Sequence, residues 1–165
     1  MGNQEVIVIE KENKSEAEFM SRNFVDKTLK NRAYINALGA ELVIKYLKTN
    51  GIDIGELHNI HSITKVLEKV DISDIILPNI HIDARVVFNE NQIFIPKSHV
   101  VYDITPDIYV FLKLDNDFES MDFLGYIEAD KIDFSKESGD YYLVDKSALY
   151  SPKSLINYVK NYSNS

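Results

Sequence analysis

The chain has 165 residues, 45% of them hydrophobic, which suffices for one packed core, so we expect a single domain over 1–165 with flexible ends at 1–14 and 161–165. It has no cysteine, which excludes a disulfide framework and a thiolate zinc site. Its net charge of −8 repels phosphate backbones and disfavours non-specific binding to nucleic acid.

The first third of the chain predicts a long helical region. After a short strand at 6–9, the stretch 15–50 lacks proline, contains one glycine and repeats its apolar residues at helical spacing. Ser15 begins a capping-box pattern, and Gly51 is a suitable stop because glycine adopts the left-handed cap conformation at little cost. A second, shorter helix is predicted over about 62–70.

From residue 75 onward the apolar residues recur with a period of two, which predicts strands. The stretch 80–88 is expected to form a hairpin with 92–96 across an Asn-Glu-Asn turn, with Pro96 at an edge or at the end of its strand. Further elements are predicted in this order: a central strand at 108–114, strands at 123–127 and 141–144, and a helix opened by Pro152.

Together these elements predict an α+β fold with a long N-terminal helical region, then a mixed β-sheet with a hairpin, and a C-terminal helix. Acidic residues are dense between 103 and 140, whereas Arg22, Lys27, Lys30 and Arg32 gather on one helical stretch. If any face of the protein meets a polyanion, we expect it to be this stretch. An ordinary solvated helix face is the simpler interpretation.

Several short apolar motifs are spread over residues 19–131. They are Ile35-Asn36-Ala37-Leu38, Tyr46-Leu47, Ile93-Phe94-Ile95-Pro96, Asp107-Ile108-Tyr109-Val110 and Leu124-Gly125-Tyr126. Together they resemble a family of small cyanobacterial proteins known as the domain of unknown function 1822 family. This resemblance implies no known activity.

A second pattern combines Gly39-Ala40-Glu41 on the predicted helix, Asp83 on the first hairpin strand and Lys97 after the second. Its order and spacing resemble the restriction-endonuclease-like nucleases with a PD-(D/E)xK motif. The resemblance implies a restriction-endonuclease-like core, with Asp83 and Glu41 as magnesium ligands and Lys97 stabilising negative charge. The acidic position two residues before the lysine is Ile95, which removes a ligand. The pattern therefore predicts a degenerate active site.

Each candidate site residue also has a simpler interpretation. Asp83 is expected to form a solvated ion pair with Arg85 or with a cross-strand neighbour. Glu41 lies near the border of the apolar stripe, where it is solvated or pairs with Lys45 one turn later. Lys97 follows a strand-ending proline and protects a strand edge from pairing.

Other chemistry is weakly indicated. His58 and His61 have a ligand-like spacing, but no third ligand is evident near them. The sequence shows neither a hydrolase triad nor a glycine-rich phosphate loop. Tyr141 and Tyr142 are adjacent on a predicted strand, so at least one is expected to be exposed or at an interface.

We therefore expect a cytoplasmic, non-catalytic domain without a cofactor, whose partner is a protein rather than a nucleic acid. Its apolar runs are too short to span a bilayer, and no membrane association is expected. One alternative is a magnesium-dependent DNA endonuclease or resolvase-like enzyme acting through Asp83, Lys97 and Glu41. Another is a structural homodimer subunit. Convergence of the three side chains at metal-bridging distance would favour the nuclease.

Overall fold

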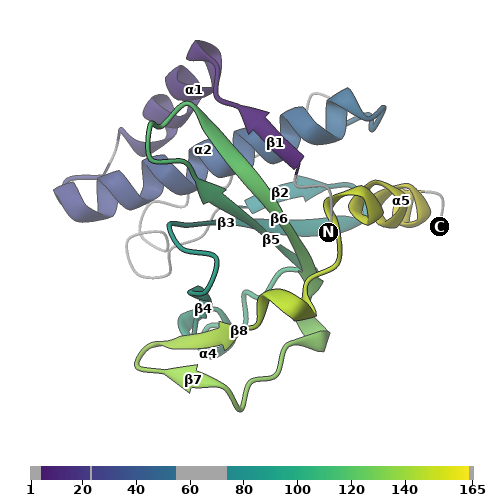
Figure 1. Cartoon of the computed structure of the whole chain (residues 1–165). Helices are drawn as coiled ribbons and strands as arrows, with labels where there is room; N and C mark the ends of the chain where they lie inside the picture. The colour runs from purple at the N-terminus through teal and green to yellow at the C-terminus, as the bar shows by residue number, and fades with distance from the viewer. Residues whose placement is uncertain (1–4, 23, 55–73, 164–165) are drawn as a thin grey trace.

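The computed structural model describes residues 5–22, 24–54 and 74–163 and has two β-sheets with helices packed around them (Figure 1). The helices are α1 (Lys11–Ser21), α2 (Lys27–Thr49), α4 (Ser98–Val101) and α5 (Pro152–Ser163), with short 3-10 helices at Ala129–Lys131 and Lys146–Ala148. The strands are β1 (Glu5–Val8), β2 (Asp74–Leu77), β3 (Ile80–Val87), β4 (Ile93–Pro96), β5 (Ile108–Leu114), β6 (Ser120–Glu128), β7 (Glu137–Ser138) and β8 (Tyr141–Val144).

The larger sheet is mixed and has five strands in the order β1-β6-β5-β3-β2. Strands β3 and β5 are parallel, and the other neighbours are antiparallel. Strand β5 lies at the centre and is buried along almost its whole length, because both faces of the sheet are covered. The expected α+β class, the mixed sheet, the central strand at 108–114 and the C-terminal helix are confirmed.

The predicted hairpin between 80–88 and 92–96 is wrong. Strand β3 pairs with β2, across the short turn that precedes Ile80, and with β5 on its other side, whereas β4 pairs with β8 in a separate three-stranded sheet. The Asn-Glu-Asn turn after β3 reverses the chain, but a turn alone does not determine which strand β4 pairs with. Burial of apolar side chains determines it here, because Ile93 and Ile95 of β4 are buried against Tyr109 on the back of the larger sheet. Pro96 ends an edge strand, as predicted.

Helix α2 packs against β3 on one face of the larger sheet. Its buried leucines share a core cluster with β3 and β5, and Gly39 lets the backbone approach, since a Cβ there would lie 2.5 Å from Val86 Cγ2. The Asp26 carboxylate begins the helix by accepting the Leu29 N–H at 2.9 Å. Gly51, with φ +82°, ends it as predicted.

Helix α1 begins before the predicted cap. The Asn13 Oδ1 atom accepts the Glu10 N–H at 2.9 Å, so the helix starts at Lys11 and Ser15 lies inside it. The expectation that Ser15 is the cap is therefore wrong, because an asparagine side chain satisfies the helix end one turn earlier. The segment expected to be a flexible end at 1–14 contains β1, which is paired with β6.

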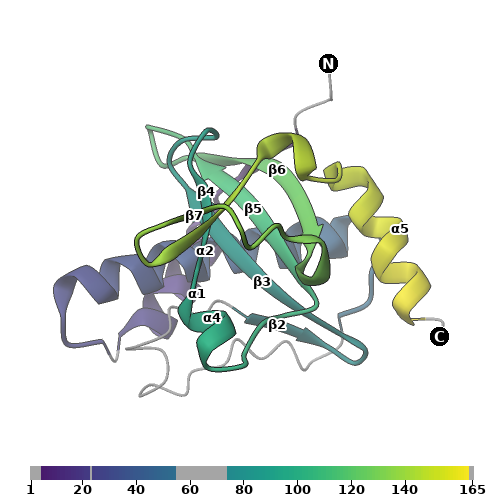
Figure 2. The same cartoon turned by 90° about the horizontal axis from the view of Figure 1, so that it is seen from below.

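The opposite face of the larger sheet is covered by the three-stranded sheet β4-β8-β7 and by α4 (Figure 2). A second apolar cluster fills the space between the two sheets. Helix α5 lies on the same side as α2, since Leu155 and Val159 belong to the larger cluster. The larger sheet is thus a middle layer, and its two faces have different surroundings.

Among the described residues, no helix has both the length and the apolarity that crossing a bilayer requires. The helix predicted at 62–70 and the pair His58 and His61 lie outside the described residues.

Candidate functional site: an arginine-lined cleft

Asp83 and Arg85 are buried neighbours on the back face of β3. Their exposures are 1% and 5%, and Arg85 Nη1 lies 3.5 Å from Asp83 Oδ1. In the parallel pair they stand beside Tyr109 and Phe111 of β5, which belong to the cluster between the two sheets. The expected ion pair between the two residues is present, but it is buried rather than solvated.

The other two residues of the nuclease pattern lie elsewhere. Glu41 belongs to α2, which covers the opposite face of the sheet from Asp83. Lys97 follows β4, and its Nζ lies 2.9 Å from Glu137 Oε2 and 5.6 Å from the centre of the Tyr142 ring. Ile95, at the position of the replaced carboxylate, is 1% exposed inside the second apolar cluster. The sheet therefore separates Glu41 from Asp83.

Metal binding by Asp83 and Glu41 stays a prediction. Within residues 5–22, 24–54 and 74–163, no three His, Cys, Asp or Glu side chains are grouped as a metal site requires. Polar and aromatic side chains are instead grouped around a cleft beside α2, which Arg85 helps to line.

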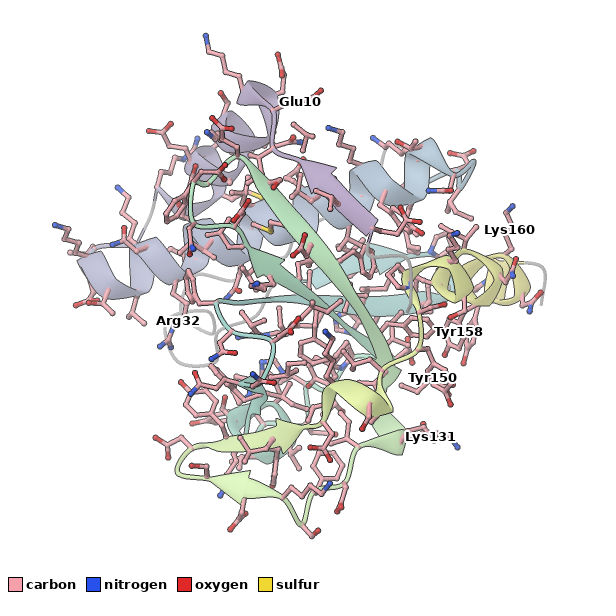
Figure 3. All side chains as sticks on the ribbon, in the orientation of Figure 1. Glu10, Arg32, Lys131, Tyr150, Tyr158 and Lys160 are labelled. Carbon is pink, nitrogen blue, oxygen red and sulfur yellow. The ribbon has the colours of Figure 1, made fainter. Side chains whose placement is uncertain are left out.

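This cleft has a volume of about 350 Å³ and lies between α2, the end of β3 and the smaller sheet. Its first wall is one face of α2, where Thr28, Arg32, Ile35 and Asn36 follow one another at helical spacing. Asn36 is 5% exposed, and its Oδ1 accepts the Val86 N–H at 3.4 Å. In Figure 3 the labelled Arg32 lies near the N-terminal half of α2, on the side of the helix toward the smaller sheet.

The remaining walls come from the β3 end, the turn after it and the smaller sheet. Phe88, at the end of β3, is 64% exposed, and the turn contributes two amide side chains, Asn89 and Gln92. Phe94 and Tyr141 from β4 and β8 contact each other, with ring centroids 4.6 Å apart. The cleft thus combines aromatic surface with amide, hydroxyl and guanidinium groups.

Arginines are concentrated at the cleft, although the protein as a whole is acidic. The chain contains three arginines, Arg22, Arg32 and Arg85, and two of them line this cleft from segments far apart in the sequence. Arg22 instead lies over the Phe19 ring, with its Cζ 3.5 Å from the ring centre. No Asp or Glu is among the described residues that line the cleft. Guanidinium groups bind carboxylate and phosphate oxygens through N–H donors. That of Arg85 is already paired with Asp83, so Arg32, which is exposed, is the arginine of the cleft that is suited to contact an anionic group.

A buried polar layer supports Arg85 from behind. Asp83 holds its guanidinium, and nearby on the same face His99 Nδ1 and the Tyr109 hydroxyl lie 2.8 Å apart, both residues being 1% exposed. Such a layer is stable only when its members satisfy one another, and it restricts the rotamers of its members. Asp83 is therefore placed to position Arg85 at the cleft.

The sequence pointed to only part of this site. Arg32 belongs to the predicted basic stretch. At least one of Tyr141 and Tyr142 was expected to be exposed or at an interface; both are half-buried, and Tyr141 lines the cleft. Arg85 was considered only as a partner of Asp83. One indication was available in the sequence: only three of the 18 Lys and Arg residues are arginines, so each arginine was worth examining as a candidate site residue. Nothing in the sequence indicated that two of the three arginines would line the same cleft.

The structure is an α+β domain with an arginine-lined cleft beside α2. The family model described as "Protein of unknown function (DUF1822)" matches residues 7–161, and the chain belongs to this family. This match confirms the resemblance to domain 1822. No curated protein and no solved structure matches the chain. The resemblance to restriction-endonuclease-like nucleases stays a prediction.

Proposed function

We propose that this domain is a non-catalytic, cytoplasmic binding domain that engages a protein partner through the arginine-lined cleft. The observation that carries the proposal is that Arg32 and Arg85 line one cleft together with aromatic rings, in a chain of net charge −8. Arginine and aromatic residues are enriched at the centres of protein interfaces, where they contribute most of the binding energy. An acidic segment of a protein fits this combination.

The volume of the cleft favours a short segment over a polymer. About 350 Å³ is at the lower end of the range for small-molecule sites and holds one or two side chains. Nucleic acid would bring many phosphates against a surface that is negative overall, which costs long-range repulsion. A peptide loop presents a single anionic group at the point where the positive charge lies.

A photo-crosslinking amino acid at Thr28, on the cleft wall, tests this proposal in cells that contain the native partner. The matched control carries the same amino acid at Lys30, which is exposed on α2 but does not line the cleft. We expect a defined protein adduct from position 28 that disappears with Arg32→Gln, and none from position 30. Equal adducts from both positions, or adducts that persist in Arg32→Gln, contradict the proposal.

The magnesium-dependent DNA endonuclease acting through Asp83, Lys97 and Glu41 is the alternative. The contacts of Asp83 with Arg85 and of Lys97 with Glu137 support the non-catalytic proposal over it. The two are separated by magnesium and manganese titration and by cleavage of supercoiled and branched DNA, using native protein beside Asp83→Asn. Metal-dependent cleavage that is lost in a folded Asp83→Asn protein would establish the enzyme.

A further inference from the structure

Strand β1 lies at an edge of the larger sheet. In the strand order β1-β6-β5-β3-β2 it pairs with β6 on one side and with no described strand on the other (Figure 1). An edge strand offers a row of backbone N–H and C=O groups to which a further strand can pair. Val6 and Val8 of this strand are 57% and 59% exposed, so apolar side chains accompany these backbone groups. Strand β1 is therefore a candidate surface for strand addition.

The backbone groups of Val6 and Val8 point away from β6. The Ile9 N–H donates to the Glu119 carbonyl at 2.8 Å, in register with the pairs between β1 and β6. Because the direction of the backbone groups alternates along an antiparallel strand, the odd-numbered residues of β1 bond to β6, whereas Val6 and Val8 face outward. The Val8 carbonyl agrees with this direction, since it accepts a hydrogen bond from Lys45 Nζ at 3.0 Å. The Val6 N–H, the Val6 carbonyl and the Val8 N–H are thus directed at any strand that lies beside β1.

The described edges of the smaller sheet are protected against strand addition. The Lys97 N–H donates to the Asp140 carbonyl at 2.9 Å, in register with the pairs between β4 and β8. The same alternation turns Phe94 and Pro96 outward from β4, and Pro96 has no N–H to donate. The opposite edge is β7, which has only two residues. Proline and short edge strands both prevent pairing between chains, and β1 contains no proline.

The charged groups beside β1 are arranged so that a reversed copy of the strand meets opposite charge. Lys45 Nζ lies at the Val8 carbonyl, beside the last residue of the strand, and 3.2 Å from Glu10 Oε2. Glu5 is the first residue of the strand. Burial raises the pKa of Tyr46 on α2, and the charge of Glu5 raises it further, which places Glu5 near α2 as well. A second β1 that runs antiparallel therefore brings its Lys45 toward Glu5 and its Glu5 toward Lys45.

The net charge of −8 is not carried by the part of the chain that surrounds β1. Residues 1–54 contain eight acidic and eight basic residues, so the excess of acidic residues belongs to the remainder of the chain. Strand β1 and helices α1 and α2 all belong to the balanced part. Two copies that approach through β1 therefore place their balanced segments nearest to each other, and salt screens the repulsion between the more distant acidic parts.

We infer that β1 pairs antiparallel with β1 of a second copy of this chain, centred on Ile7, so that the two larger sheets form one continuous sheet. With Ile7 on the two-fold axis, Val6 of each copy lies opposite Val8 of the other, and the outward N–H and carbonyl groups of both residues pair. A carbonyl oxygen accepts two hydrogen bonds, so the Val8 carbonyl keeps its bond from Lys45. The contact does not use the arginine-lined cleft, and its test is therefore independent of the proposed function.

Removal of one outward N–H tests the dimer, with self-association measured by sedimentation equilibrium. Val6→Pro removes the N–H that points at the partner and leaves the bonds between β1 and β6, which come from the odd-numbered residues. Two bonds across the axis are lost, so we expect self-association at least about tenfold weaker than in native protein. The matched control Val6→Thr keeps the N–H and a β-branched side chain and is expected to associate as native protein does. Urea denaturation of both variants checks that they are folded.

Cysteine variants test the register, because the native chain contains no cysteine. In the proposed dimer, the side chain introduced by Val6→Cys faces that introduced by Val8→Cys in the other copy, with Cα atoms about 5.5 Å apart, which a disulfide spans. Two copies of the same variant are offset by two residues, which separates these Cα atoms by more than about 8 Å and prevents a disulfide. Mild oxidation is expected to give a disulfide-linked dimer in an equal mixture of the two variants and none in either variant alone.

The two experiments have outcomes that overturn the inference. A native protein that is monomeric at all concentrations does so and leaves the edge of β1 to a strand of another protein. A dimer that a folded Val6→Pro protein still forms with native strength does so too, because its contact lies elsewhere. Disulfide-linked dimers that form in either cysteine variant alone as readily as in the mixture contradict the register. In each case an adduct from position 28 that depends on Arg32 would leave the proposed function standing.

Discussion

Two clefts formed by described residues have different linings, and they lie at opposite ends of the molecule. The arginine-lined cleft is beside the N-terminal half of α2, whereas a cleft of about 510 Å³ lies beside α5, where Figure 3 labels Tyr158. Four carboxylates line the second cleft, from Asp103, Asp107, Glu128 and Asp130, and no Lys or Arg is among its described lining residues. We call it the acidic cleft.

The two clefts differ in how their charge arises. The acidic cleft draws its carboxylates from the stretch 103–140, where acids are already dense in the sequence, and its sign follows the net charge of the chain. The arginine-lined cleft gathers two of three arginines against that net charge. On the proposal above, an anion is repelled by the protein at long range and held only by short contacts within the cleft, which favours a specific partner over any polyanion.

Removing Asp83 should have the largest effect on the arginine end. Asp83→Ala leaves the buried Arg85 charge without its carboxylate, and we expect the free energy of unfolding to fall by about 3–5 kcal/mol. The double variant Asp83→Ala/Arg85→Met should regain most of this loss, because no buried charge remains. Urea denaturation measures both. A single variant that costs under about 1 kcal/mol would contradict the buried-pair account.

Filling the space at Gly39 should disturb the contact between α2 and β3 that forms one wall of the arginine-lined cleft. Gly39→Ala places a methyl group 2.5 Å from Val86 Cγ2, and we expect a loss of about 1–3 kcal/mol, although alanine favours the helix by about 1 kcal/mol. Gly39→Ala/Val86→Ala should reduce the loss by removing the clash. Thermal unfolding measures the series, and a stabilised single variant would show that the two elements are less tightly packed.

Alkaline pH should act on the acidic end through Tyr158. Burial raises the pKa of Tyr158, and its hydrogen bond with Tyr162 and the charge of Glu128 act in the same direction. Below the unfolded value of about 10 the stabilisation is complete; above it the unfolded chain ionises first, so stability falls as the pH rises toward the folded pKa. Tyr158→Phe should flatten this decline in urea midpoints measured between about pH 8 and pH 11. Equal slopes in both proteins would argue against the effect.

The smallest effect is expected at Lys97, which the nuclease pattern placed in the active site. Its ion pair with Glu137 is partly exposed, so Lys97→Gln should change the free energy of unfolding by less than about 1 kcal/mol and leave both clefts intact. Urea denaturation at low and high salt checks this. A loss of several kcal/mol would mean that Lys97 has a structural role the ion pair does not explain.

The sequence predicted those features that depend on local pattern. The central strand at 108–114, the stop at Gly51 and the helix opened by Pro152 follow from periodicity and from the conformational preferences of glycine and proline. The hairpin failed because a turn reverses the chain without choosing its partner. Ile93 and Ile95 instead cover the back of the larger sheet.

The candidate site was harder to predict, because it depends on long-range pairing. Strand β3 was expected to have one polar face, so Asp83 and Arg85 were placed in solvent; the smaller sheet covers that face and buries them. Arg32 and Arg85 line the same cleft because α2 crosses the end of β3. That crossing is set by packing around Gly39 and is not visible in either segment alone.

The central claim, that the arginine-lined cleft binds an acidic peptide segment, is tested most directly by side-chain NMR of the three arginine Nε–H groups. The probe is the tripeptide N-acetyl-Asp-Phe-Glu-amide, and its control is the Asn-Phe-Gln analogue. We expect the signals of Arg32 and Arg85 to shift with saturation by the acidic tripeptide alone, while that of Arg22, which lies over Phe19, stays unchanged. Equal shifts at all three arginines, or none at Arg32 and Arg85, would contradict the account.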